Sequence, residues 1–227
     1  MIVVPYCWRD WMGAEKVLLW MAELDGCQEN ECLVVGGKGV EASHRNNVES
    51  AARKAFRVVS SVETSVVDDR PWPMGPNTMF KCVLGWMYKK GGGHFWWNEP
   101  DCVPLKSGWL KSLESEYLSI GKPFMGCVTH RPVTHLTGCA MYPWDVFRYN
   151  ESMTMAEKIA FDCVVPEKTL KHTHHTELFQ HEWDDDKGLC PTFPKVEDLK
   201  RIRSDAVVYH RNKSLCLIDR MRERGKK

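Results

Sequence analysis

Hydrophobic residues recur along the first third of the chain in two alternating patterns. Short continuous apolar runs at residues 2–6, 32–37 and 65–67 predict buried strands. Between them, residues 10–25 and 45–60 place apolar side chains three and four positions apart, which is typical of helices with one buried face. The order strand, helix, strand, helix, strand predicts a parallel α/β sheet.

The remaining pattern continues this alternation less regularly. Residues 70–77 are rich in Pro, Gly and Asn and predict a loop. Further on, the pattern predicts helices over 78–89, 105–118 and 152–162, and strands over 94–98, 123–128, 136–142 and 206–210. No internal repeat or low-complexity linker divides the chain, so we expect a single domain over 1–217, followed by a basic C-terminal tail over 218–227.

Composition and charge narrow the class of protein. The 227 residues carry a net charge of +1, which gives no reason to expect a polyanion partner over the whole surface. The chain has 10 cysteines, several of them inside apolar runs, and no C-x-x-C pair, so a zinc ribbon is not expected. With no evident signal peptide and no apolar run long enough to span a membrane, we expect a reduced, cytoplasmic protein without membrane contact.

An acidic pair, Glu99 and Asp101, follows the aromatic run Phe95-Trp96-Trp97. Alternate residues of an extended segment point the same way, so both carboxylates can face one point. Like charges held together are costly unless a cation joins them, and a divalent metal with a phosphate would do so. A solvated turn is the plainer alternative, but the apolar residues on both sides favour a buried metal and phosphate site at a strand end.

A second candidate group follows the predicted strand at 206–210. His210 could supply a nitrogen ligand to the same cation, and Lys213 could meet a phosphate. A histidine at a strand end is, on its own, more often a hydrogen-bonded structural residue.

Three other segments keep two interpretations each. The loop at 70–77 is either a rigid connection or a lip over a pocket, where Asn77 could bind sugar hydroxyls and the preceding Asp68 and Asp69 could bind a nucleoside. Residues 200–227, with ten Lys or Arg against three acids, form either a solvated helix or a patch for a phosphate backbone. A cluster of histidines favours an exposed loop over a zinc site, because it lacks an H-E-x-x-H pattern; its members are His172, His174, His175 and His181.

These segments together resemble a known family. They are similar to segments of small GT-A glycosyltransferases, which are encoded largely by bacteriophages. The matching segments are the strand Val-Val-Pro-Tyr, a Trp-Pro-x-Gly-x-Asn loop, the run Phe-Trp-Trp-Asn-Glu-Pro-Asp-Cys-Val-Pro-Leu, the segment His-Leu-Thr-Gly-Cys-Ala-Met-Tyr-Pro and a late Val-Val-Tyr-His-Arg-Asn-Lys. The resemblance covers most of residues 1–217. It implies a GT-A-like α/β fold, a mixed and mainly parallel sheet flanked by helices.

The resemblance also implies roles for single residues. Glu99 and Asp101 match the metal-binding DxD motif, with Glu in place of the first Asp, and His210 matches a late metal ligand. The metal would be Mn²⁺ or Mg²⁺ and would hold a nucleotide-sugar donor, for which a UDP-sugar is expected. The end of the first strand would line the nucleotide pocket, which implicates Pro5, Tyr6 and Asp10.

The resemblance leaves the reaction open in two respects. If the transfer inverts the sugar, a carboxylate must deprotonate the acceptor, and Asp162 is the first candidate, with Asp145 second; a retaining reaction needs no such base. The acceptor could be a hydroxylated or hydroxymethylated base in phage DNA, in the host cytoplasm, or a glycan or protein. A nucleotidyltransferase-like enzyme and a zinc-dependent nucleic-acid-binding module are the competing functions.

Overall fold

The protein folds into one α/β domain with two sheets. The computed structural model describes residues 1–67, 72–130, 133–182 and 192–225. The strands are β1 Ile2–Tyr6, β2 Gln28–Lys38, β3 Phe56–Val67, β4 His94–Trp97, β5 Val103–Pro104, β6 Phe124–Thr129, β7 His135–Pro143, β8 Thr173–His175, β9 Phe179–His181 and β10 Val208–His210. The helices are α1 Trp11–Asp25, α2 Ala42–Ala55, α3 Met74–Lys89, α4 Trp109–Ile120, α5 Phe147–Asn150, α6 Ser152–Met155, α7 Pro166–Leu170, the 3-10 helix η1 Val196–Arg201 and α8 Cys216–Gly225.

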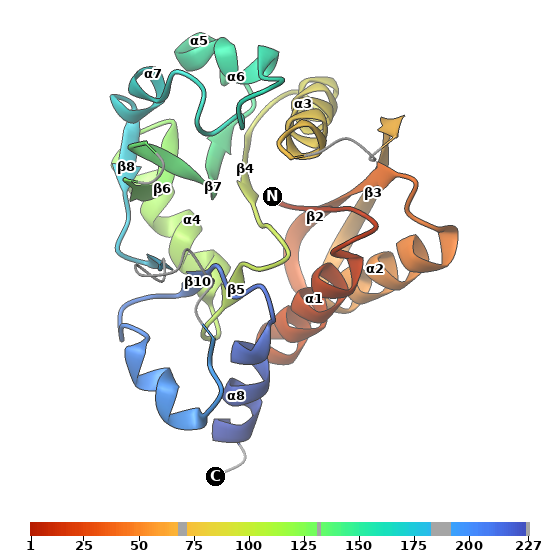
Figure 1. The fold of residues 1–227 in the computed structure, drawn as a ribbon, viewed down its shortest axis with the longest axis vertical. Helices are drawn as coiled ribbons and strands as arrows, with labels where there is room; N and C mark the ends of the chain where they lie inside the picture. Colours follow the sequence, from red (N-terminus) through yellow and green to blue (C-terminus); the bar gives the residue numbers. More distant parts are fainter. Residues whose placement is uncertain (68–71, 131–132, 183–191, 226–227) are drawn as a thin grey trace.

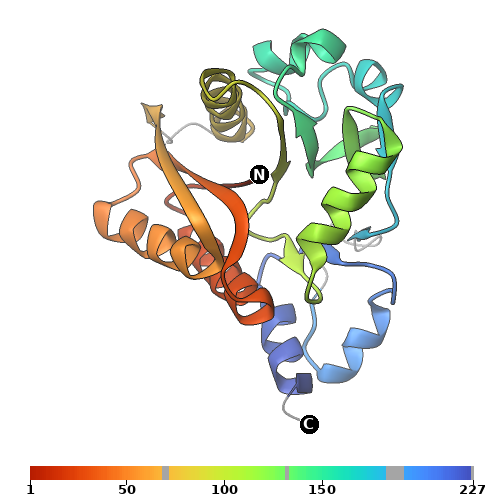
Figure 2. The same cartoon turned by 180° about the vertical axis from the view of Figure 1, so that it is seen from behind.

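The large sheet has the strand order β3-β2-β1-β4-β7-β6-β8 (Figures 1 and 2). Strands β3, β2, β1 and β4 run parallel, and β7 is antiparallel to both β4 and β6. The carboxyl ends of β1 and β4 therefore meet the amino end of β7 at one edge of the sheet. Because open α/β sheets place ligands at the carboxyl ends of their parallel strands, this edge is where a site is expected.

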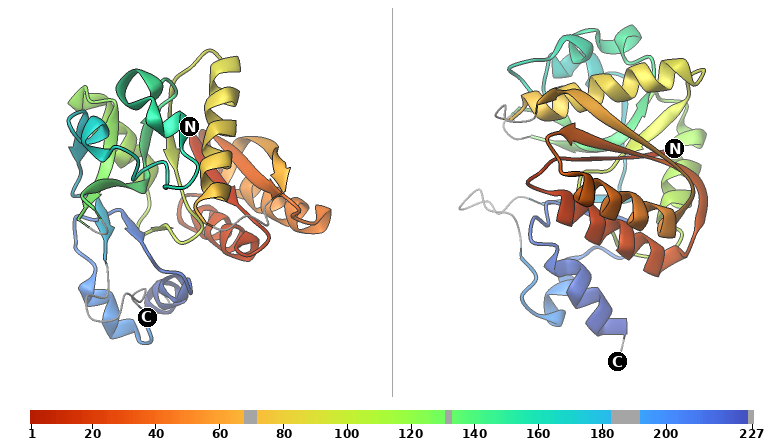
Figure 3. Two further views of the ribbon diagram at one scale, coloured as in Figure 1. Left: turned by 45° about the horizontal axis from the view of Figure 1, so that its top comes forward. Right: turned by 90° about the vertical axis from the view of Figure 1, so that its right-hand side faces the viewer.

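Helices cover both faces of the large sheet. On one face α1, α2 and α4 enclose a core that includes Val4, Val34 and Trp96, and α3 covers the other face against Val3, Val35 and Phe95 (Figure 3). The alternation of inward side chains along β1 explains both cores, since successive residues of a strand point to opposite faces. The predicted mixed, mainly parallel α/β fold is thus confirmed.

The small sheet brings the end of the chain to the acidic pair. Its order is β5-β10-β9, and β10 pairs with β5 so that Tyr209 lies opposite Val103. Continuing that register places His210 beside Cys102, the residue after Asp101. Strand β5 is only two residues long, yet its pairing joins segments more than a hundred residues apart.

Several element predictions were wrong at their boundaries. The helix predicted over 45–60 ends at Ala55, because the β-branched run after Phe56 continues as strand β3, which extends the short strand predicted at 65–67. Residues 74–77, predicted as loop, are the first turn of α3, where proline is tolerated. The helix predicted over 105–118 begins only at Trp109, after Gly108 in a left-handed conformation.

The segment between 152 and 182 differs more from its prediction. The helix predicted over 152–162 ends at Met155. The segment around the histidines, predicted to be an exposed loop, forms the short strands β8 and β9. Three-residue strands carry too little alternation to stand out in a sequence.

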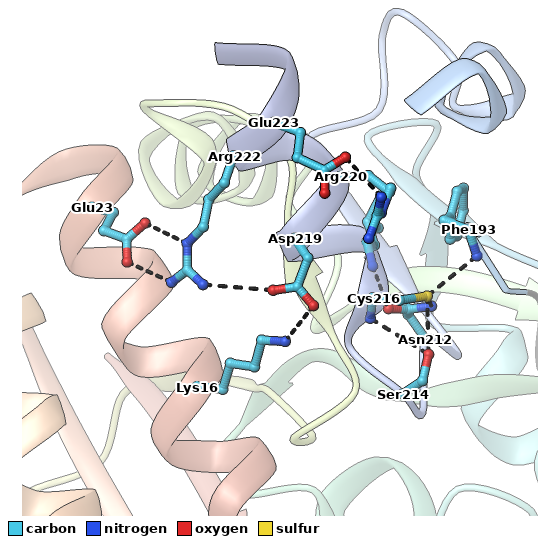
Figure 4. A network of polar contacts seen from close by, with 11 residues as sticks. Lys16, Glu23, Phe193, Asn212, Ser214, Cys216, Asp219, Arg220, Arg222 and Glu223 are labelled. Atoms are coloured by element: carbon cyan, nitrogen blue, oxygen red, sulfur yellow. Dashed lines mark hydrogen bonds and ion pairs between the residues drawn. The ribbon is translucent and has the colours of Figure 1, made fainter. Parts of the chain in front are cut away.

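Helix α8 is an integral part of the domain. Leu217 and Ile218 are fully buried in the core on the α1 face. Arg222 Nε donates to Glu23 of α1 at 2.8 Å, and Lys16 of α1 binds Asp219 at 2.9 Å (Figure 4). Residues 218–225 of the predicted basic tail are therefore a helix anchored to α1. Among the described helices, none is both long and apolar enough to cross a membrane.

Candidate active site

The acidic turn after β4 is held by a buried amide. Asn98 is fully buried and its Oδ1 accepts a hydrogen bond from the Trp96 indole at 3.0 Å. Its Nδ2 donates to the carbonyls of Glu99 at 3.1 Å and Cys102 at 3.2 Å. The amide closes the turn from within, which fixes the direction in which the two carboxylates point.

Glu99, Asp101 and His210 converge at this turn. His210 Nε2 lies 3.3 Å from Glu99 Oε2 and 3.5 Å from Asp101 Oδ1. Neighbouring ligands of an octahedral ion bound at about 2.1 Å are separated by about 3.0 Å. Each acid therefore lies near the ligand spacing from His210, and the oxygen and nitrogen donors suit such an ion. Among the described residues, however, the donor atoms that all lie within 4.8 Å of one another belong to Glu99, His210 and Cys139, and Asp101 is not in that group.

The charge of Asp101 is balanced by two basic groups. Its side chain is only 6% exposed, and Lys213 Nζ lies 2.6 Å from Oδ2. Burial alone would raise the pKa of Asp101, but the ion pairs with His210 and Lys213 outweigh burial and lower it. In the same pairing, burial opposes the charge on His210, while Cys139 and Asp101 raise its pKa well above the ordinary value. Asp101 is thus a carboxylate poised for a cation.

A bulge in β7 makes room for Glu99. The pairing of β6 with β7 shifts between Gly126 and Val128, opposite residues 137–139, and the Tyr142 hydroxyl lies 3.1 and 2.9 Å from the carbonyls of Thr137 and Gly138. A Cβ atom at Gly138 would lie 2.5 Å from Glu99 Oε1. Bulges commonly redirect strands next to active sites, and here the bulge presents a glycine to the carboxylate.

Asp162 lies on the other side of Gly138. The same Cβ position is 3.5 Å from Asp162 Oδ2, which places this carboxylate next to that of Glu99. Asp162 Oδ2 also lies 3.8 Å from Nε2 of the buried His135, whose Nδ1 is 2.7 Å from the Val133 carbonyl. Burial raises the pKa of Asp162 to about 6, with a further contribution from Glu99 and an opposing one from His135.

A cavity of about 560 Å³ opens beside the acidic turn. Six of the residues proposed from sequence line it, and they come from the end of β1, the acidic turn and the segment after β10: Pro5, Tyr6, Asp10, Glu99, Asp101 and Lys213. Trp8 and Trp72 line it as well and are 51% and 73% exposed. The cavity thus combines aromatic surface with a cluster of charges.

The first strand contributes two structured polar groups to this cavity. Asp10 Oδ1 accepts a hydrogen bond from the backbone N–H of Cys7 at 2.6 Å, and burial raises the Asp10 pKa. Tyr6 is buried, with its hydroxyl group 3.0 Å from where a Cβ of Gly36 would lie, and burial raises its pKa to about 12. Asp10 therefore shapes the loop after β1 as well as lining the cavity.

Two residues proposed from sequence lie elsewhere. Asp145 follows the carboxyl end of β7, which is the opposite edge of the sheet, because His94 at the start of β4 pairs with Pro143; its carboxylate binds Arg148 at 3.1 Å. Asn77 is buried, and its amide binds the backbone of residues 157, 159 and 161. Asn77 thus holds the segment that carries Asp162 and is not placed to bind a sugar hydroxyl. Asp68 and Asp69 lie outside the described residues.

The histidine cluster does not gather at one point. His181 Nδ1 lies 3.0 Å from His210 Nδ1, and burial and the neighbouring His210 lower the His181 pKa to about 2. His174 binds Glu116 at 3.0 Å and His175 lies 3.5 Å from Glu177. One histidine therefore contacts His210 while two others pair with glutamates.

Sequence analysis missed several residues of the site. Asn98, His135 and Gly138 form its frame, and Cys139 has its sulfur near both Glu99 and His210. The run His-Leu-Thr-Gly-Cys was noted as part of the resemblance, but its glycine carried no signal that it faces a carboxylate. Only the pairing of β7 with β4 reveals that contact.

Comparison with solved structures identifies the fold. No protein-family model matches the sequence, and a search of curated proteins finds no match. Mouse xyloside xylosyltransferase 1 superposes with a TM-score of 0.58 at 9% identity, over 93% of this chain and 96% of that one. The galactosyltransferase LgtC, crystallised with donor and acceptor sugar analogues, gives 0.57 at 9% identity over 98% and 94%. The bifunctional glycosyltransferase WbbM gives 0.57 at 9% identity over 93% of this chain and 45% of its own. The chain thus has the GT-A fold that these glycosyltransferases share.

Proposed function

We propose that the protein is a metal-dependent glycosyltransferase that moves a sugar from a nucleotide sugar, with a UDP-sugar as the expected donor, to an acceptor hydroxyl. The observation that carries the proposal is the convergence of Glu99, Asp101, His210 and Lys213 beside a cavity lined by the end of β1. The fold shared with glycosyltransferases supports it.

The metal would be held by Glu99, Asp101 and His210. When bound, a divalent ion would neutralise the charge that gathers on the donor's diphosphate as the glycosidic bond breaks. Lys213 pairs with Asp101, lines the cavity and is more than half exposed, so it would be placed to meet that diphosphate. Its positive charge would then stabilise the leaving group.

Asp162 is proposed to act on the acceptor in an inverting transfer. It lies next to Glu99 and is largely buried, and its pKa of about 6 leaves it ionised at neutral pH and able to accept a proton. Asn77 holds its segment in place through hydrogen bonds to the backbone. The anomeric configuration of the product, measured by NMR, tests this role, because a retaining transfer needs no such base.

A hydroxylated base in phage DNA remains one proposed acceptor. Its main support from sequence was the basic C-terminal segment, and five of the ten Lys and Arg residues there are ion-paired in the described part of the chain. Arg201, Arg203, Arg220 and Arg222 bind acidic partners. A glycan or protein hydroxyl is the alternative, and the exposed Trp8 and Trp72 at the cavity would suit either a sugar ring or a base.

Donor binding is the first experiment. Isothermal titration calorimetry with UDP-sugars and Mn²⁺, compared with nucleoside triphosphates, separates a glycosyltransferase from a nucleotidyltransferase. We expect UDP-sugar binding that Asp101→Asn abolishes and that Glu29→Gln, a remote exposed control, leaves unchanged. Metal-independent binding, or a preference for triphosphates, would overturn the proposal.

Acceptor assays complete the test. Wild-type protein is incubated with the bound donor and with hydroxymethylated DNA, plain DNA, or a panel of glycans and peptides. Transfer to hydroxymethylated DNA alone supports the DNA acceptor. Transfer only to a glycan or peptide removes DNA and keeps the sugar-transfer activity.

A further inference from the structure

A buried cysteine, Cys139, lies beside the oxygen and nitrogen ligands of the proposed metal centre. Cys139 is fully buried on β7, and its sulfur, a Glu99 carboxylate oxygen and a His210 ring nitrogen all lie within 4.8 Å of one another. A soft sulfur therefore stands beside two ligands of the proposed ion. We propose that Cys139 Sγ binds the metal when the ion is thiophilic, so that the centre takes Zn²⁺ or Co²⁺ as a Glu99–Cys139–His210 site. The inference rests on the proposed function, because it concerns the same metal centre.

The bulge in β7 places this sulfur. Residues 137–139 form the part of β7 that lies opposite the shifted pairing with β6, and the Thr137 hydroxyl donates to the Cys139 carbonyl at 3.1 Å. Gly138 then faces Glu99, while Cys139 joins the core beside His210. Glu99 spans both positions, with Oε1 near Gly138 and Oε2 3.3 Å from His210. Glu99 and His210 can therefore bind an ion together with Cys139.

The two ligand sets favour different ions. Mg²⁺ prefers oxygen ligands in near-octahedral geometry, whereas Zn²⁺ binds thiolate at about 2.3 Å and imidazole at about 2.0–2.1 Å in a tetrahedral site. Three protein ligands and one open position is the arrangement of many zinc centres. Asp101 can stay with Lys213, 2.6 Å away, when the ion moves toward the sulfur. When the metal–sulfur bond forms, the thiol proton passes to the buffer and one water molecule leaves the ion.

Cys102 offers a matched control. It is also fully buried, lies next to Asp101 in the acidic turn, and has its thiol in hydrogen-bond contact with that of Cys139, so it probes the same surroundings. Among the described residues, the candidate metal groups include Cys139 and exclude Cys102. If buried cysteines here serve only as small hydrophobic side chains, Cys139→Ala and Cys102→Ala should behave alike.

Cobalt spectroscopy tests the ligand directly and needs no substrate. Metal-free, reduced protein is titrated with Co²⁺, and the near-ultraviolet charge-transfer band of a cobalt–thiolate bond is recorded. We expect the band in wild-type protein and in Cys102→Ala and its loss in Cys139→Ala. Zn²⁺ affinity, measured by competition with a chelating dye, should fall on the order of 100-fold in Cys139→Ala, since loss of even an outer partner costs about 10–100-fold. Mg²⁺ affinity should stay the same.

Wild-type protein alone provides a second measurement if Cys139→Ala fails to fold. X-ray absorption of the zinc-loaded protein should contain one sulfur at about 2.3 Å. A shell of nitrogen and oxygen only, or a cobalt band that persists in Cys139→Ala, would overturn the inference. Neither result touches the sugar-transfer proposal, which is judged by donor binding with Mn²⁺.

Discussion

At the scale of single residues, the site depends on uncharged side chains as much as on its acids. Asn98 uses both ends of its amide to close the turn between Glu99 and Cys102, and Gly138 leaves the space that the Glu99 carboxylate occupies. These two positions therefore fix where the carboxylates lie, which the proposed metal site requires.

Gly138→Ala tests this space. The new Cβ would lie 2.5 Å from Glu99 Oε1, so the carboxylate must shift from the position that it takes beside His210. We expect Mn²⁺ affinity, measured by calorimetry, to fall on the order of 10–100-fold, as it does when a supporting contact of a metal site is lost. Gly85→Ala is the control, because nothing lies within 4 Å of its new Cβ and alanine favours the helix. Unchanged Mn²⁺ affinity in Gly138→Ala would contradict the steric argument.

Asp162→Asn separates stability from activity. The pKa of Asp162 in the folded protein, about 6, is above its value in the unfolded chain. Protonation of Asp162 therefore adds to the free energy of unfolding in acid, and this contribution is lost as the pH rises through 6. The variant stays neutral, so it should gain stability over wild type at pH 8, by about 2–3 kcal/mol at most, and gain little near pH 4. Urea unfolding at both pH values measures the difference. A pH-independent difference would show that Asp162 is not held at a raised pKa.

The same variant should lose transfer activity. If Asp162 is the acceptor base, Asp162→Asn lowers kcat by about 10²–10⁴-fold, and wild-type activity rises with pH through about 6. Initial rates across pH 5–8 test this, with donor binding as the control that the metal centre is intact. A variant with normal kcat would remove the base role.

At the scale of elements, α8 contributes more to stability than its prediction as a basic tail indicates. Leu217→Ala should cost about 2–5 kcal/mol of unfolding free energy, because Leu217 is fully buried. By contrast, a double-mutant cycle on Arg222 and Glu23 should give a coupling of no more than about 1 kcal/mol, since both side chains are partly exposed. Urea denaturation measures both. A cost below 0.5 kcal/mol for Leu217→Ala would mean that α8 is an appendage.

The elements also mark how far sequence patterns reach. The apolar run of β1 and the helical period of α1 predicted those elements because both are long and uninterrupted. The change from α2 to β3 was missed because Val59 continues the helical spacing of Ala52 and Ala55 across the boundary. The acidic turn was found because its residues adjoin in sequence. The contact of Gly138 was missed because strand pairing, which is not a local property, creates it. The contact of His135 was missed because Asp162 comes from a segment outside the strands that Asn77 holds in place.

At the scale of the whole molecule, charge is spread and largely paired. The net charge is +1, and the arginines near the C-terminus bind acids of other segments. We therefore expect only weak non-specific DNA binding, with a Kd on the order of 10⁻⁴ M at physiological salt. Fluorescence anisotropy with plain and hydroxymethylated DNA measures it. Tight binding of plain DNA would reveal a basic surface that the ion pairs do not neutralise.

The pairing of β5 with β10 has a consequence for how the protein is made. The cavity is lined by residues 5–10 and by residues 213–215, so segments about two hundred residues apart in the chain must come together to complete it. Glu99 cannot pair with His210 in a nascent chain until His210 has emerged, however well β1 to β4 have formed by then. A ligand that binds this cavity would stabilise only the folded domain, and its retention would report that the two segments have come together.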